Sequence, residues 1–131
     1  MSLYELRIDR KRKYLQIALH GYWDEKTNDA YEREELGGLE ALARLGRPTF
    51  CIVDLSDFPP QAKETVERIS KRLHASDTIM PSRLAVIVPG ALVKMQVDRT
   101  VPQEGVEKRV FASREEGEAW LFDEDRQCAV G

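Results

Sequence analysis

The sequence predicts one α/β domain with a mixed, mostly parallel sheet of about five strands and about four helices. Two uninterrupted apolar runs, Phe50–Val53 and Leu84–Val88, are typical of central strands that are covered on both faces. Residues 62–73 lie between them and place apolar side chains at i, i+4, i+7 and i+11, the spacing of an amphipathic helix. Because such a helix returns the chain to the start of the next strand, we expect parallel strands and right-handed crossovers after the first hairpin.

Composition and charge limit the class of protein. The 131 residues are 33% charged and 42% hydrophobic, which is ordinary for a globular domain, and the net charge of -3 gives no general attraction to nucleic acid. No apolar run approaches the roughly 18 residues that an integral membrane segment needs, and the N-terminus begins with strand-like alternation instead of a signal peptide. We therefore expect a cytoplasmic protein with no nucleic-acid partner.

The N-terminal residues predict an antiparallel hairpin. Leu3–Asp9 and Tyr14–His20 both alternate apolar and polar side chains, as half-buried strands do. The connection between them, Asp9–Lys13, is highly charged, which favours a solvated turn that discourages edge-to-edge pairing. A contact with an anion or a membrane surface is the alternative role for these charges.

The first helix is predicted to begin after Asp24, an N-cap residue, and to run to about Leu45. Glu25 stands in the first turn, where the helix dipole favours a negative charge. Gly37 and Gly38 weaken the helix by roughly 1–2 kcal/mol of intrinsic propensity. This pair either permits close packing against the sheet or divides the segment into two short helices.

The second half of the chain continues the alternation of helix and strand. Pro59–Pro60 is expected to put a proline near the first turn of the helix after the central strand, where the missing amide hydrogen of proline is not needed. A short helix over Ala91–Arg99 and a strand over Lys108–Phe111 follow. Ser113 is the expected N-cap of the last helix, because a glutamate three residues later completes a capping box. Residues 123–131 are expected to form a flexible tail.

Cysteine and histidine are too scattered for a disulfide framework or a metal site. Cys51 lies inside an apolar strand and Cys128 in the expected tail. His20 and His74 have no cysteine, histidine or carboxylate at a recognisable ligand spacing. We expect no metal and no cofactor.

Several segments resemble the SpoIIAA-like branch of the STAS superfamily across nearly the whole chain. They are the order of elements, VDLS at Val53–Ser56, PSRLAVIV at Pro81–Val88, and VEKRVFASREEGEAWL at Val106–Leu121. The resemblance implies a regulatory domain that binds a partner kinase or regulator. In the anti-sigma-factor-antagonist type, phosphorylation of a serine in an Asp-Ser-Ser-Gly-like turn, at the start of the helix after the central strand, switches this binding.

That switch is missing from this sequence. The corresponding segment reads PQAKET at Pro60–Thr65 and contains no Ser-Ser-Gly. Phosphorylation acts by adding about two negative charges beside a helix start, so the usual mechanism needs a hydroxyl there. Ser56 and Thr65 remain as candidates for modification, each with a different geometry. For Ser56 the alternative is a hydroxyl that bonds to nearby backbone in a turn.

The resemblance also implies a site for small apolar or lipid-like ligands. In open sheets such a site lies outside the carboxyl ends of the parallel strands. The topology places the following residues near that rim: Trp23, Ser56, Asp57, Phe58, Pro59, Pro89 and Gly90. Exposed rings at Trp23 or Phe58 would favour binding, and the alternative is that both rings cover the end of the core.

Catalytic motifs are not found in the sequence. Asp54 and Asp57 could act as paired carboxylates, but no histidine, cysteine or lysine accompanies them. No phosphate-binding glycine loop and no GxSxG elbow occurs. We therefore expect a non-catalytic regulatory or protein-interaction module, with a small apolar-ligand carrier or sensor as the alternative. The sequence leaves a homodimer open, through a sheet edge or a helix face.

Overall fold

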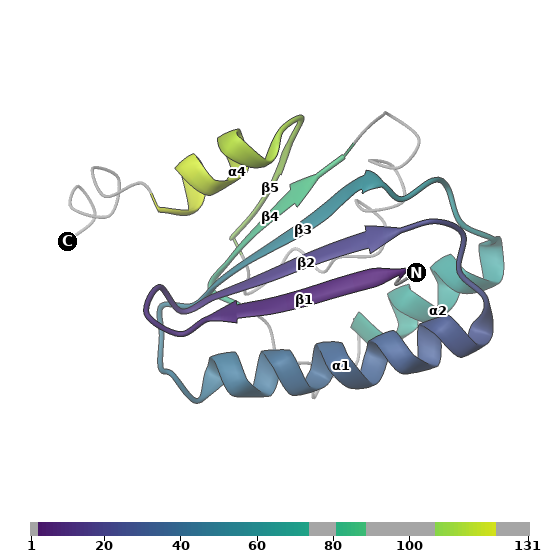
Figure 1. Ribbon diagram of the computed structural model, residues 1–131, viewed down its shortest axis with the longest axis horizontal. Helices are drawn as coiled ribbons and strands as arrows, with labels where there is room; N and C mark the ends of the chain where they lie inside the picture. Colours follow the sequence, from purple (N-terminus) through teal and green to yellow (C-terminus); the bar gives the residue numbers. More distant parts are fainter. Residues whose placement is uncertain (1–2, 74–80, 89–106, 123–131) are drawn as a thin grey trace.

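The computed structural model describes residues 3–73, 81–88 and 107–122, and it confirms the predicted α/β fold (Figure 1). One five-stranded sheet has the order β1-β2-β3-β4-β5. Strand β1 is antiparallel to β2, and the later neighbours pair in parallel. The strands are β1 (Tyr4–Asp9), β2 (Tyr14–His20), β3 (Phe50–Asp57), β4 (Arg83–Ile87) and β5 (Glu107–Phe111). The helices are α1 (Glu25–Ala43), α2 (Lys63–Leu73) and α4 (Arg114–Leu121).

Some predictions fall on other parts of the chain. The helix expected over Ala91–Arg99, the tail 123–131, His74 and Cys128 lie outside the described residues.

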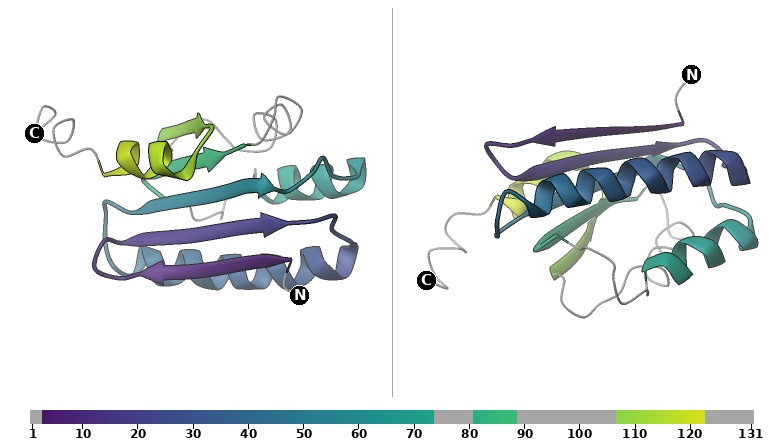
Figure 2. Two further views of the ribbon diagram at one scale, coloured as in Figure 1. Left: turned by 45° about the horizontal axis from the view of Figure 1, so that its top comes forward. Right: turned by 90° about the horizontal axis from the view of Figure 1, so that it is seen from below.

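Helices α1 and α4 lie on opposite faces of the sheet (Figure 2). Strand β3 therefore buries alternate residues in two cores. Cys51 and Leu55 belong to the core beneath α1, whereas Phe50 and Ile52 belong to the core beneath α4. This burial on both faces is what the uninterrupted apolar run of β3 predicted.

Helix α1 is a single helix, so its glycine pair does not divide it. Asp24 is the N-cap, as predicted, and its carboxylate accepts a hydrogen bond from the backbone N–H of Thr27 at 2.8 Å. A Cβ added at Gly38 would lie 3.3 Å from Leu15 Cδ1, which means that Gly38 lets the helix approach the sheet closely. A Cβ added at Gly37 would meet nothing within 4 Å.

Two boundaries differ from the sequence prediction. Strand β3 extends to Asp57, four residues beyond the apolar run, because β2 continues to pair with it as far as His20. Helix α2 begins at Lys63, so Pro59–Pro60 lies near the first turn of the helix, as expected, but precedes it. A turn intervenes, with the N–H of Phe58 bonded to the carbonyl of Leu55 at 3.0 Å.

Helices α1 and α2 are joined through one guanidinium. Arg68 of α2 donates to the carboxylates of Asp29 and Glu32 on α1 and lies 3.9 Å from a carboxylate oxygen of Glu25. A guanidinium donates in a planar fork and can bind several carboxylates together. This cluster fixes α2 beside the N-terminal half of α1, near the ends of the parallel strands (Figure 1).

Gly117 tests how tightly α4 packs. A Cβ at this position would lie 2.9 Å from Ile87 Cδ1 in the core beneath α4. We expect Gly117→Val to lower the free energy of unfolding by about 1–3 kcal/mol through overpacking, although valine is the better helix former. Ala119→Val, at an exposed position of the same helix, is the control and should cost about 0.5 kcal/mol. Urea unfolding measures both, and a Gly117→Val midpoint at or above that of the control would contradict this packing.

Candidate functional site

The carboxyl ends of β2 and β3 form a corner from which two loops leave for α1 and α2. We define the carboxyl-end corner as residues 20–24 and 54–61. The N–H of Gly21 donates to the carbonyl of Asp57 at 3.0 Å and so extends the pairing of the two strands. Gly21 has φ +65°, a conformation that side chains disfavour. The sequence-predicted rim thus exists between β2 and β3.

One buried amide joins the two loops. The side-chain oxygen of Gln61 accepts from the backbone N–H of Trp23 at 2.9 Å. The amide nitrogen of Gln61 donates to the carbonyls of Gly21 at 3.0 Å and Pro59 at 2.7 Å. Gln61 is only 8% exposed, and its bond to Trp23 is buried, so the N–H of Trp23 depends on it instead of on water. Sequence reasoning missed this residue, since a single glutamine after two prolines carries no local signal.

Trp23 and Phe58 are buried, with exposures of 1% and 7%. Their rings lie 5.3 Å apart, and the Trp23 ring lies 4.9 Å from that of Tyr31 on α1. The indole N–H of Trp23 donates to the carbonyl of His20 at 3.0 Å. The expectation of an exposed ring at Trp23 or Phe58 was wrong. Both rings cover the end of the core, which was the alternative.

The exposed side chains of the corner belong to residues close to the buried Trp23 and Phe58 in the sequence. Tyr22 is 61% exposed although it stands between two residues that Gln61 binds, Gly21 and Trp23. Five further corner residues are exposed: Asp24, which caps α1, and Ser56, Asp57, Pro59 and Pro60. The corner therefore presents an aromatic ring, two prolines and a carboxylate on a hydrogen-bonded base. Sequence reasoning missed Tyr22, because strand alternation ends at Gly21 and no longer indicates which side chain faces outward.

Ser56 and Asp54 form a local pair. The Ser56 hydroxyl donates to Asp54 Oδ1 at 2.6 Å, and the same oxygen accepts from the Ser56 backbone N–H at 3.0 Å. The hydroxyl thus bonds to a side chain and not, as expected, to the backbone. Asp57 Oδ2 lies 3.7 Å from His20 Nδ1. Because Ser56 is exposed, water competes with any charge stabilisation that a nucleophile would need there.

The other candidate positions lie apart from this pair. Thr65 is the third residue of α2, in its first turn. Pro89 and Gly90 lie outside the described residues.

The buried thiol of Cys51 is chemically quiet. Burial, and next the charge of Glu35, raise the pKa of Cys51, so the thiolate that reacts or binds metal is disfavoured. In residues 3–73, 81–88 and 107–122 no three His, Cys, Asp or Glu side chains are grouped to hold a metal ion. Within the same ranges no helix combines the length and apolarity needed to span a bilayer.

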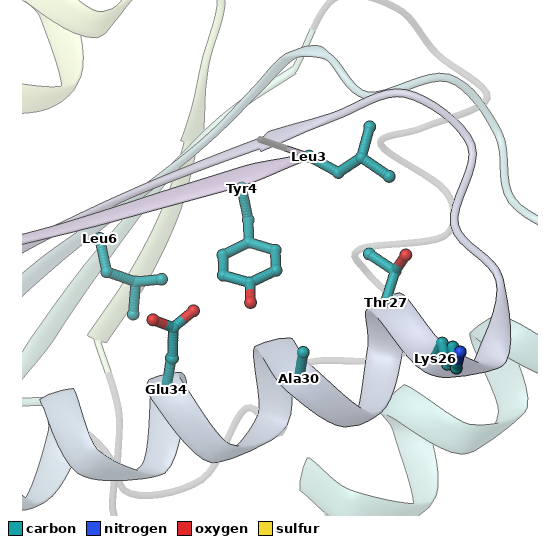
Figure 3. A pocket seen from close by; sticks show the side chains of 7 residues that line it. All are labelled: Leu3, Tyr4, Leu6, Lys26, Thr27, Ala30 and Glu34. Carbon is teal, nitrogen blue, oxygen red and sulfur yellow. The ribbon is translucent and has the colours of Figure 1, made fainter. Parts of the chain in front are cut away.

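A hollow of about 700 Å³ lies between β1 and α1, next to the corner and not within it (Figure 3). Its lining comes from both elements and consists of Leu3, Tyr4, Leu6, Lys26, Thr27, Ala30 and Glu34. The Tyr4 ring projects from β1 toward α1 (Figure 3). A hydrogen bond to Glu34 raises the pKa of the Tyr4 hydroxyl. The hollow is open to solvent at the edge of the sheet, whereas the sequence placed a ligand site at the strand ends.

Comparison with known proteins identifies the fold. No protein-family model matches the chain, and no curated protein is significantly similar to it in sequence. The chain is similar to the crystal structure of an uncharacterised DUF3478-family protein with a SpoIIAA-like fold from Shewanella loihica. The TM-score is 0.64 and the identity 17%, over 90% of this chain and 93% of that one. This chain therefore has a SpoIIAA-like, STAS-type fold, as its sequence motifs suggested.

Gln61 gives a test of the corner. We expect Gln61→Leu to lower the free energy of unfolding by about 2–3 kcal/mol, because the buried N–H of Trp23 and the partly buried carbonyls of Gly21 and Pro59 lose their partner. Gln16→Leu is the control. Gln16 is half-buried and its side-chain oxygen accepts from Arg114, so its loss should cost less than about 1 kcal/mol. Urea unfolding compares them, and equal losses would show that Gln61 does not hold the corner.

Proposed function

We propose that this chain is a non-catalytic protein-interaction module that binds its partner at the carboxyl-end corner. The observation that carries the proposal is the exposed Tyr22 side chain on a base that Gln61 and the buried Trp23 fix. Tyrosine is enriched at binding hot spots because its ring supplies a large contact area with few rotatable bonds. A base that is already ordered also lowers the entropy cost of binding.

Pro59, Ser56 and Asp57 complete the proposed contact surface. Prolines add apolar area without rotamer entropy, and the Asp57 carboxylate favours a partner with a basic group at the rim. For a module of STAS type we expect the helix after the central strand and the loop before it to take part in this surface. These are α2 and residues 58–62 here. The proposed partner is therefore a protein with an apolar, partly basic surface.

Modification of Ser56 is the proposed means of regulating this surface. A phosphate on its hydroxyl would remove the 2.6 Å hydrogen bond to Asp54 and place about two negative charges between Asp54 and Asp57. Like charges so close repel one another, so we expect modification at Ser56 to open this part of the corner and release the partner. Thr65 is the alternative position, because the first turn of a helix favours a phosphate.

Tyr22→Ser tests the proposed function, with Leu36→Ser as a matched control. These two residues are the large apolar side chains of the described part that are exposed, at 61% and 50%, and Leu36 lies on α1 away from the corner. A tagged chain is returned to its native host, and captured proteins are quantified by mass spectrometry. We expect one partner to fall at least about tenfold with Tyr22→Ser, because losing a hot-spot ring costs 2 kcal/mol or more. The same partner should be retained by wild type and Leu36→Ser.

Equal capture by both variants would contradict the proposal, provided that both unfold at the wild-type temperature. Phe58→Asp is unsuitable as a surface probe, since a carboxylate at this buried position would disrupt the core itself.

A carrier or sensor of a small apolar ligand is the second candidate function, and the hollow between β1 and α1 favours it. Its volume falls within the range of small-molecule sites, and Leu3, Leu6 and Ala30 give it apolar walls. Lys26 and Glu34 add charged groups that could orient a polar head.

Ala30→Phe would fill this hollow and should abolish binding of any co-purifying ligand seen by native mass spectrometry. Ala43→Phe, at an exposed position of the same helix, should leave the ligand in place. Identical spectra for the two variants, or a wild-type protein that carries no ligand from its host, would remove the hollow as a carrier site.

A further inference from the structure

The outer edge of β1 carries unpaired backbone groups. Strands β1 and β2 pair residues whose numbers sum to 23, so Leu3 stands opposite His20. This is a hydrogen-bonded pair, because the N–H of His20 donates to the carbonyl of Leu3 at 2.8 Å. Hydrogen-bonded pairs alternate in antiparallel strands, so Glu5 and Arg7 exchange bonds with β2. The N–H and C=O groups of Leu6 and Ile8 therefore point to the open side. In the part of the chain that the structure describes, no strand pairs there.

This edge has only part of the usual protection against another strand, namely the exposed charges of Glu5 and Arg7. Natural edge strands are blunted by proline, by bulges or by inward-pointing charges. Strand β1 contains no proline and pairs in unbroken register over its six residues. Its side chains on the α1 face are apolar, namely Tyr4, Leu6 and Ile8. The charged turn after Asp9 lies beyond the paired length.

We propose that a second copy of this chain pairs with the edge, β1 against β1, antiparallel about a two-fold axis at Leu6. Exposed charges alternate along the other face of the strand, with Glu5 and Arg7 on either side of this axis. The axis places Glu5 of each copy opposite Arg7 of the other, in two symmetric pairs. These are non-hydrogen-bonded pairs, in which opposing side chains approach most closely.

Charge selects this register over its neighbours. Residues with outward-pointing backbone groups must pair with each other, so the register can shift only in steps that move the axis to Glu5 or to Arg7. An axis at Glu5 brings the two Glu5 carboxylates together. An axis at Arg7 opposes the two Arg7 side chains and sets Glu5 against Asp9. Like charges directly opposite are destabilising, so an axis at Leu6 is favoured over both neighbouring positions, and it pairs more of β1 than an axis at Ile8 would.

The helix layer is compatible with this pairing. A Cβ at Gly38 would lie 3.3 Å from Leu15 of β2 and 3.7 Å from Leu6 of β1, so α1 lies over both strands. Strands are about 4.8 Å apart. The α1 axis lies midway between β1 and β2, and the two-fold axis lies midway between the two β1 strands, so these two axes are about 5 Å apart. The two α1 helices are then about 10 Å from each other. This is close to the usual separation of packed helices, about 8–10 Å.

The flank of α1 that would face the second copy carries small residues alongside the charged side chains of Lys26 and Glu34. Glu34 lines the hollow beside β1. Residues three, four or seven positions away lie on the same face of a helix, and here these are Gly37, Ala30 and Ala41. The backbone of Gly37 leaves open space that nothing within its own chain fills. The second β1 strand would also cover the open side of the hollow. The proposal does not depend on the carboxyl-end corner, which lies at the ends of the strands.

A charge exchange tests the proposal by sedimentation equilibrium. Wild type is expected to be a dimer. Glu5→Arg and Arg7→Glu should each weaken dimerisation at least about tenfold, because each puts like charges in both symmetric pairs. The double variant Glu5→Arg/Arg7→Glu restores opposite charges and should dimerise like wild type. An equimolar mixture of the two single variants should form a heterodimer. Both positions are exposed and face uncharged residues of β2, Ala18 and Gln16, so folding is preserved.

Two outcomes would overturn the inference. A wild-type chain that stays monomeric up to about 1 mM would leave the edge to a strand of another protein. Dimers that respond equally to the single and the double variants would place the interface on a different surface.

Discussion

Strand β3 has a parallel strand on each edge and a helical layer on each face, and this burial determines where polar groups can stand. From Phe50 to Ile52 every side chain enters one of two cores. Carboxylates and hydroxyls appear in β3 only from Asp54 onward, at its carboxyl end. The residues that β3 contributes to the core beneath α4, Phe50 and Ile52, lie at its other end. Because β2 is parallel to β3, its last residues reach the same edge of the sheet. The corner is the place where a doubly buried strand first meets water.

The corner then has to satisfy backbone groups that leave the sheet. Loops normally do this with water, but here the rings of Trp23 and Phe58 exclude water from the interior side. Gln61 replaces it by accepting one hydrogen bond and donating two, which uses both donors of the amide. The buried ring of Trp23 and the bonded amide hold Tyr22 in an exposed position between them. A surface of this kind is suited to recognition, since little of it needs to be ordered on binding.

The sequence predicted those features whose causes are local. Apolar runs identified β3 and β4, alternation identified the hairpin, and the side chain of Asp24 marked the start of α1. The corner depends on contacts across 38 and more residues, such as that between Gln61 and Trp23, and no periodicity reports them. The same limit explains why the sequence left the exposure of Trp23 open and did not single out Tyr22. A glycine at positive φ ends the alternation, and only the tertiary fold decides which of two adjacent aromatic rings turns inward.

The two proposed surfaces are geometrically independent, and their combination has a consequence for binding. An antiparallel β1–β1 contact about a two-fold axis normal to the sheet points the carboxyl ends of the parallel strands of the two copies in opposite directions. The two corners then lie at opposite ends of one continuous sheet, so a small partner bound at one cannot reach the other. Avidity would arise only for partners that are themselves repeated or long enough to span the sheet. A dimer of this geometry would therefore act as a bridge between two partner molecules and not as a clamp around one.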